Sequence, residues 1–188
     1  MNVYEKCPMF ENEKYRLRLV NETDTEDLLK VYSDLRAVPL FNGDNCNGDD
    51  FHYTTYERME QAVDFWKQSY EGGWFVRWSV VDKAKDEAVG TIEEFRRDAE
   101  DYFTDCGLLR LDLRSDYEKT QEIASILSLI VPASFELFGC DKVATKAVPA
   151  AGERIRALED MGFVPADEKL TGHDGTQYDG YFVLKKQV

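Results

Sequence analysis

The sequence predicts an α/β fold in which helices cover both faces of a mixed, mostly antiparallel central sheet. Several segments alternate hydrophobic and polar residues with the period of a strand, and 109–113 is the clearest of them. Other segments repeat hydrophobic residues every three or four positions, and the longest helical pattern spans 119–138. A meander of three strands is followed by helix, strand, helix and strand, an order typical of a mixed sheet between two helical layers.

The first half of the chain is expected to form a strand and two helices before the meander. Thr23 and Glu26 fit a capping box, in which each side chain bonds a backbone N–H of the other, and so do Thr54 and Glu57. A helix is therefore expected after each pair. The polar loop between these helices lacks both key carboxylates of a calcium loop, so we expect no calcium site there. The strands expected in this half and the meander are 15–20, 75–81, 89–95 and 109–113.

The second half is expected to contain the long helix, a short strand, another helix and a last strand. Pro132 removes a hydrogen bond inside the long helix and should kink or split it. Because a strand–helix–strand crossover makes its two strands parallel neighbours, we expect 109–113 and 142–148 to lie side by side, splayed at one end. The last strand is expected within 179–185, after a glycine-rich turn.

The composition narrows the classes of function. The 188 residues are expected to form one domain, 1–188. Asp and Glu number 37 against 23 Lys and Arg, which gives a formal net charge of -14. This charge repels phosphates and anionic lipids, so we expect neither nucleic-acid nor membrane binding, and it weakly favours a cationic substrate. The cysteines lack metal-site spacing and the N-terminus resembles no signal peptide, so we expect no metal and a cytoplasmic location.

Three segments of the second half resemble one protein family when they are taken together. They are Leu113–Tyr117 at the end of a strand, Phe135–Val143 at the exit of the long helix, and Pro149–Phe163, which ends in a Gly-Phe pair. In this order and spacing the chain resembles the GNAT N-acetyltransferases, within them the branch of ribosomal-protein N-terminal alanine acetyltransferases, over residues 15–186. The resemblance implies that acetyl-CoA is the cosubstrate and that a primary amine of a small molecule or peptide attacks it directly in a ternary complex. A homodimer is left open.

The resemblance also implies where acetyl-CoA would bind. Its pantetheine would pair with the strand backbone around Leu111 and Leu113. Its pyrophosphate would lie at the start of the long helix, where unpaired N–H groups and the helix dipole attract an anion. The residues of this loop are Lys119, Thr120, Gln121, Glu122, Ile123 and Ala124.

The chain departs from the family pattern at both ends of this implied site. Glu122 stands where the family has a glycine, and its carboxylate would repel a pyrophosphate at close range. In the last helix, Ala151 and Arg154 replace the asparagine and serine of the family, and Leu158 replaces the tyrosine that many members use as a general acid. A catalytically weakened domain that binds an acyl-CoA, a peptide or a partner therefore stays open as an alternative.

The candidate general bases are carboxylates on strands near the implied cleft. Asp112 points to the face opposite Leu111 and Leu113, while Glu93 and Glu94 lie on the neighbouring strand. A general base must reach the amine directly or through one water molecule, and we expect Asp112 or Glu94 to do so. Trp66, Trp74 and Trp78 either line an acceptor pocket or pack in the core.

Overall fold

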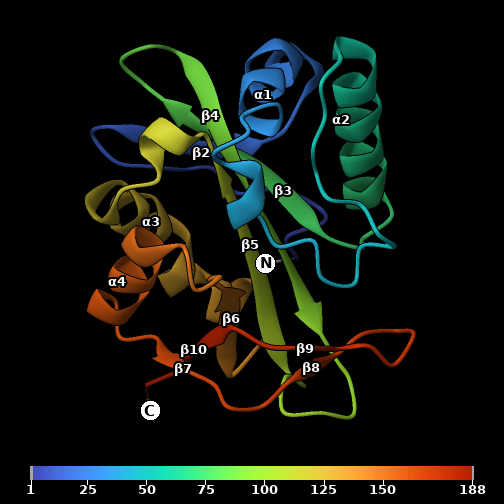
Figure 1. The fold of residues 1–188 in the computed structure, drawn as a ribbon, viewed down its shortest axis with the longest axis vertical. Coiled ribbons are helices and arrows are strands. Elements are labelled where there is room, and N and C mark those ends of the chain that lie inside the picture. Colours follow the sequence, from blue (N-terminus) through green and yellow to red (C-terminus); the bar gives the residue numbers. More distant parts are fainter. Residues whose placement is uncertain (1, 188) are drawn as a thin grey trace.

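The computed structural model describes residues 2–187 and confirms the predicted α/β fold (Figure 1). One eight-stranded sheet has the order β1-β2-β3-β4-β5-β6-β10-β7, and a separate two-stranded sheet is formed by β8 and β9. Helices α1 and α2 pack on one face of the large sheet, and α3 and α4 pack on the other. The helices are α1 (Thr25–Tyr32), α2 (Tyr56–Glu71), α3 (Thr120–Leu137) and α4 (Gly152–Asp160). The strands are β1 (Phe10–Glu11), β2 (Tyr15–Leu19), β3 (Val76–Asp82), β4 (Glu87–Arg97), β5 (Cys106–Leu113), β6 (Lys142–Lys146), β7 (Val164–Pro165), β8 (Leu170–Thr171), β9 (Gln177–Tyr178) and β10 (Tyr181–Lys185).

The two predicted capping boxes were placed near the right positions but on the wrong residues. Asn21 and Asp24 form the first box, around a short 3-10 helix (Glu22–Asp24) that leads into α1. At the start of α2, the side chain of Thr55 accepts a hydrogen bond from the backbone N–H of Arg58 at 3.2 Å. Asparagine and threonine cap by the same geometry, so neighbouring candidates can be told apart only by the backbone path.

The long helix α3 continues through Pro132 from end to end, so the proline does not split it. Its buried face packs on one side of β5, with Ile123, Ile126 and Ile130 in the same core cluster as Leu109 and Leu111. This burial explains why the helix survives the missing hydrogen bond, since tertiary packing supplies most of the stability of helices in proteins. None of the helices in residues 2–187 is both long and apolar enough to cross a membrane.

Strands β5 and β6 lie side by side and then separate, as predicted. They pair in parallel only between Cys106–Leu109 and Lys142–Thr145. Beyond this point β5 continues to Leu113 with β4 as its ladder partner, while β6 ends at Lys146. The end of β5 therefore has backbone groups on the β6 side that no strand pairs.

Candidate active site

The gap between β5 and β6 holds the side chain of Arg154, which extends from the first turn of α4. Its Nη1 atom donates a hydrogen bond to the carbonyl oxygen of Leu111 at 2.8 Å, and a longer one to that of Leu40 at 3.3 Å. The residue is only 2% exposed. A guanidinium therefore supplies the donor that β5 lacks where β6 has separated from it, and it lies where the family resemblance expects the pantetheine.

Glu118, in the loop between β5 and α3, neutralises this buried guanidinium. Nε and Nη2 of Arg154 donate to the two carboxylate oxygens of Glu118 at 2.7 and 2.8 Å, and both side chains are buried. Such bidentate pairs are among the strongest side-chain interactions. Removing one partner of a buried pair typically costs about 3–5 kcal/mol, because the other charge is left without compensation. From the sequence, Arg154 was considered only as a replacement for a serine.

The start of α3 binds an anion that the chain itself provides. The backbone N–H of Thr120 donates to the carboxylate of Glu153 at 2.8 Å, and the Thr120 hydroxyl donates to the same oxygen. The contact lowers the pKa of Glu153. Glu153 thus lies at the helix end where the sequence places a pyrophosphate, in agreement with the attraction of a helix N-terminus for anions.

The carboxylate of Glu122 is turned toward β2. Lys14 Nζ lies 2.6 and 2.7 Å from its two oxygens, and the hydroxyl of Tyr15 donates to it as well. Burial opposes ionisation, but these hydrogen bonds outweigh it and lower the pKa of Glu122. Its charge is therefore compensated, which weakens the repulsion expected from the sequence. Of the other loop residues, Lys119 and Gln121 are exposed, Thr120 and Ala124 are half-buried, and Ile123 is buried in the core.

The gap between β5 and β6 opens between α4 and the β5–α3 loop, and we call this region the donor-side cleft. Its mouth is acidic. A cavity of about 400 Å³ is lined by three carboxylates, those of Asp116, Glu118 and Glu153, and by one arginine, Arg36. The contact groups match acetyl-CoA in kind, because the Leu111 carbonyl accepts an N–H and the start of α3 accepts an anion. Both groups are occupied by Arg154 and Glu153, so any other donor or anion at these positions would have to displace these two side chains.

The two candidate bases lie on opposite faces of the sheet, and the structure does not bring them together. Asp112 accepts hydrogen bonds from the hydroxyl of Tyr32 at 2.7 Å and from Arg77 at 3.3 Å, on the face covered by α1 and α2. Burial raises its pKa, although Arg77 and Tyr32 act in the opposite direction. Glu94 faces α3, where Ser134 donates to it at 2.8 Å, and burial raises its pKa to about 8.

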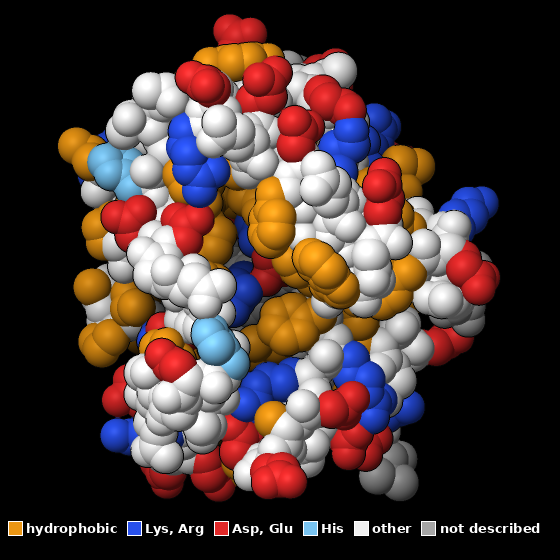
Figure 2. Space-filling view, turned by 90° about the vertical axis from the view of Figure 1, so that its right-hand side faces the viewer, with side chains coloured by type: hydrophobic (Ala, Val, Ile, Leu, Met, Phe, Trp, Pro, Cys, Tyr) orange, Lys and Arg blue, Asp and Glu red, His pale blue; other side chains and the backbone are white. Residues whose placement is uncertain are grey.

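A second cavity, which we call the acceptor-side cavity, lies across the sheet from α3 and α4. It measures about 450 Å³ and lies between α2, the loop 42–53 and strands β3 to β5. Figure 2 looks onto this side and shows apolar side chains around a hollow in which charged groups are visible. Trp66 and Trp74 line the cavity, whereas Trp78 is buried in the core on the α3 side of the sheet.

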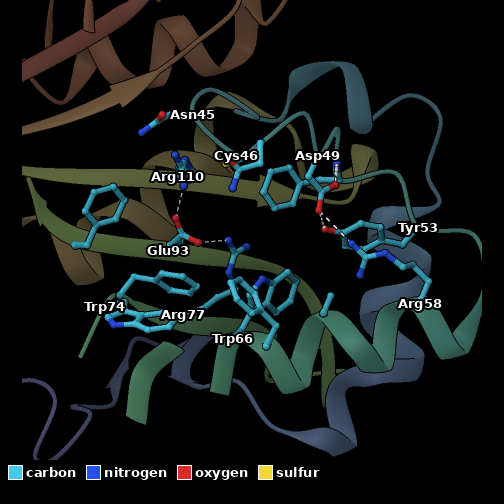
Figure 3. A pocket seen from close by; sticks show the side chains of 16 residues that line it. Asn45, Cys46, Asp49, Tyr53, Arg58, Trp66, Trp74, Arg77, Glu93 and Arg110 are labelled. Carbon is cyan, nitrogen blue, oxygen red and sulfur yellow. Dashed lines mark hydrogen bonds and ion pairs between the residues drawn. The ribbon is translucent and has the colours of Figure 1, made fainter. Parts of the chain in front are cut away.

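The floor of the acceptor-side cavity is a row of charges across three strands. Glu93 on β4 is the register partner of both Arg77 on β3 and Arg110 on β5. Each arginine forms an ion pair with one of its carboxylate oxygens (Figure 3). Burial alone would raise the pKa of Glu93, but the two guanidinium charges outweigh it and lower that pKa. Glu93 is a candidate from the sequence, but neither arginine is. Their one signal in the sequence is that each lies at a polar position within a predicted strand.

Comparison with known proteins shows similarity in fold at low sequence identity. No protein-family model matches the chain, and no curated protein sequence does. A GNAT-family acetyltransferase from Bacillus anthracis is 12% identical, with 95% of this chain and 98% of that chain covered and a TM-score of 0.69. A ribosomal-protein-S5-alanine acetyltransferase from Vibrio fischeri is 17% identical, with 95% and 96% covered and a TM-score of 0.67.

A third solved structure was determined with ligands bound. The spermidine N-acetyltransferase from Vibrio cholerae, in complex with CoA and spermine, is 13% identical to this chain. The similarity covers 93% of this chain and 96% of that chain, at a TM-score of 0.65. Matches of this extent span nearly the whole chain, with the eight-stranded sheet and both helical layers. The chain has the fold of the GNAT acetyltransferases.

Proposed function

We propose that the protein is an acetyl-CoA-dependent N-acetyltransferase that acts on a primary amine by direct attack in a ternary complex. The observation that carries the proposal is the separation of β5 from β6 beside the start of α3. The proposed donor and acceptor sites are adjacent, because two consecutive residues of β5, Arg110 and Leu111, each contribute to one of them. The Leu111 carbonyl lies in the gap, and the side chain of Arg110 lines the acceptor-side cavity. An acceptor in that cavity would therefore lie next to an acetyl group held in the gap, and such placement supplies much of the rate of a transfer reaction.

Different residues of the chain are proposed to bind acetyl-CoA and to accept the amine proton. The Leu111 carbonyl and the Thr120 N–H would hold the pantetheine and pyrophosphate of acetyl-CoA, which supplies the acetyl group as a reactive thioester. We propose Asp112 as the base on the acceptor face, where Tyr32 and Arg77 hold its carboxylate. Because Asp112 lies behind Arg77 and outside the cavity lining, it would accept the amine proton through a water molecule. Glu94 has a pKa close to neutral, which suits a base, but its contact with Ser134 faces α3.

A titration with acetyl-CoA followed by a thiol-release assay over a panel of primary amines tests this function. We expect acetyl-CoA to bind more weakly than it would to a permanently open cleft. The apparent affinity falls in proportion to the fraction of molecules in which Arg154 and Glu153 have left the cleft. Thiol release that requires both acetyl-CoA and an amine supports acetyl transfer. A protein that neither binds acetyl-CoA nor releases thiol with any amine would contradict it.

A second function, ligand binding without acyl transfer, is favoured by the buried pair of Arg154 and Glu118. This pair fills the gap and lies beside an acidic cavity mouth, and both features oppose a phosphate-bearing cosubstrate. The double variant Arg154→Ala/Glu118→Gln removes the guanidinium without leaving a buried charge behind. If acetyl-CoA binds neither the native protein nor this variant, while a ligand still binds the acceptor-side cavity, the second function is the correct one.

A further inference from the structure

We infer that the acceptor-side cavity recognises a compound with a carboxylate on a flat aromatic body. The inference rests on the proposed function in one respect: the same compound then carries the primary amine that is acetylated. The cavity combines aromatic walls with three guanidinium groups, those of Arg58, Arg77 and Arg110.

The charge of the lining is the first argument. The three arginines face two carboxylates, Asp49 and Glu93, so the lining has one positive charge in excess. Asp112, which lies behind Arg77 and outside the lining, brings the count to zero. The chain as a whole has a net charge of -14, so this cavity is less acidic than the average of the molecule. A ligand anion would be repelled less here than over most of the remaining surface.

Two unsatisfied arginine donors at the floor of the cavity also support an anionic ligand. Arg77 and Arg110 share the carboxylate of Glu93, and Arg77 also forms an ion pair with Asp112. The Nε atom of each arginine is buried with no hydrogen-bond partner among the described residues. Buried polar groups are nearly always hydrogen-bonded, and buried guanidinium groups are stabilised by carboxylates. Arg110 has Glu93 as its one carboxylate partner among the described residues, so a ligand carboxylate beside Arg110 would add a second anion there.

The aromatic surfaces of the cavity do not offer a cage for a cationic ligand. The Cζ atom of Arg77 already lies 4.0 Å from the ring centroid of Trp66, and the Cζ atom of Arg58 lies 4.1 Å from the ring centroid of Tyr53. A second cation would compete with these stacked arginines and meet their charge. Among the described residues, no arginine lies over the rings of Phe65 and Trp74, so these two side chains can pack against a flat apolar body.

Two aromatic side chains are unusually exposed for their size. Trp74 is 65% exposed and Phe65 is 52% exposed, and both line the acceptor-side cavity. Exposed apolar side chains that gather around a hollow mark a binding surface more often than isolated ones do. An aromatic ligand would cover them, with its carboxylate toward the arginines inside.

The loop over the cavity is held in a strained conformation. Asn45, Asn47 and Phe51 have φ angles of 59°, 55° and 57°, a region that a bulky residue such as phenylalanine rarely occupies. Asp44 anchors this loop, because its carboxylate lies 2.6 Å from Lys146 Nζ and its carbonyl accepts from Arg110 at 2.8 Å. Strain of this kind persists where surrounding contacts enforce it, and it is common at ligand sites.

Two matched series of compounds test the inference without acetyl-CoA. The first consists of tryptophan, tryptophanamide and tryptamine, and the second of phenylalanine, phenylalaninamide and phenethylamine. Within a series the ring and the amine are constant, and only the carboxylate changes. We expect calorimetry to show that at least one acid binds about tenfold more tightly than its amide and amine, the scale of one charge-assisted hydrogen bond. If the amides or amines bind as tightly as the acids in both series, or if none of the compounds binds, the inference is wrong.

Two variants separate charge from apolar contact. In Arg110→Gln the preference for the acid over its amide should disappear, whereas Trp74→Ala should weaken all members of a series by a similar factor. Arg58→Gln, at a more exposed arginine, serves as a second charge variant if Arg110→Gln does not fold. An acid preference that persists in every folded arginine variant would contradict the assignment. If the acids bind as expected but acetyl-CoA causes no thiol release, the ligand class stands and the proposed acetyl transfer fails.

Discussion

The two faces of the sheet differ in whether a buried carboxylate has a charged partner, and two adjacent residues of β4 show the difference. Glu93 faces the acceptor-side cavity, where two arginines lower its pKa. Glu94 faces α3, where Ser134 is its one hydrogen-bond partner within residues 2–187, and burial raises its pKa to about 8. The donor-side cleft pairs Arg154 with Glu118 one to one, and the two fill the gap. The acceptor side instead places three arginines around an open volume, where Arg77 and Arg110 share the carboxylate of Glu93.

The largest expected effect concerns the pH dependence of stability through Glu94. Its pKa in the folded protein is raised from 4.5 to about 8, so it favours folding below pH 4.5 and opposes it as pH rises toward 8. We expect the free energy of unfolding to fall by roughly 3–5 kcal/mol over this range from Glu94 alone. Urea unfolding of the native protein and of Glu94→Gln, measured at several pH values, isolates this contribution.

The control for this experiment is Glu93→Gln on the opposite face. The pKa of Glu93 is lowered, so its contribution to stability is present above pH 4.5 and is lost on acidification. The two variants should therefore change the pH profile in opposite directions. Identical profiles for the native protein and Glu94→Gln would mean that Glu94 is not buried without a charge partner.

The second prediction concerns the pair that closes the donor-side cleft. Arg154→Ala leaves the carboxylate of Glu118 buried, and we expect a loss of about 3–5 kcal/mol in the free energy of unfolding. The double variant Arg154→Met/Glu118→Leu removes both charges and should lose much less, because an apolar pair can replace a buried ion pair at little cost. Denaturant unfolding measures both. Equal losses in the single and double variants would show that packing, and not charge, holds Arg154 in the gap.

The sequence was sufficient for the backbone of this site but not for the side chains that fill it. The hydrophobic periods of 109–113 and 119–138 predicted β5 and α3, and the crossover rule made β6 the neighbour of β5. The contact of Arg154 with Leu111 joins residues 43 positions apart, and no local pattern encodes it. The row through Glu93 depends on strand register, which a periodic pattern leaves free by steps of two residues.

The third prediction tests Asp112 as the proposed base on the acceptor face. Asp112→Asn should lower the rate of thiol release at saturating acetyl-CoA and amine by about a hundredfold, the lower range for loss of a general base. Acetyl-CoA affinity should change little, since the Asp112 carboxylate lies on the face opposite α3. The hydrogen bond from Tyr32 can be kept by the asparagine oxygen, which makes this a conservative change. A rate within threefold of the native value would remove Asp112 from the reaction.

The smallest expected effect comes from Glu153, whose carboxylate competes for the start of α3. In Glu153→Gln the intramolecular anion is lost, while the amide oxygen can still accept from Thr120. We expect acetyl-CoA to bind about threefold more tightly, because a phosphate would no longer have to displace a carboxylate from the N–H groups of the helix. The gain should shrink as salt rises, since screening weakens competition between exposed charges. Glu159→Gln, in the last turn of the same helix, changes the net charge equally at a distance from Thr120 and is the matched control. An equal gain in both variants would trace the effect to the net charge of the molecule, and no gain in either would show that Glu153 leaves the helix start without hindrance.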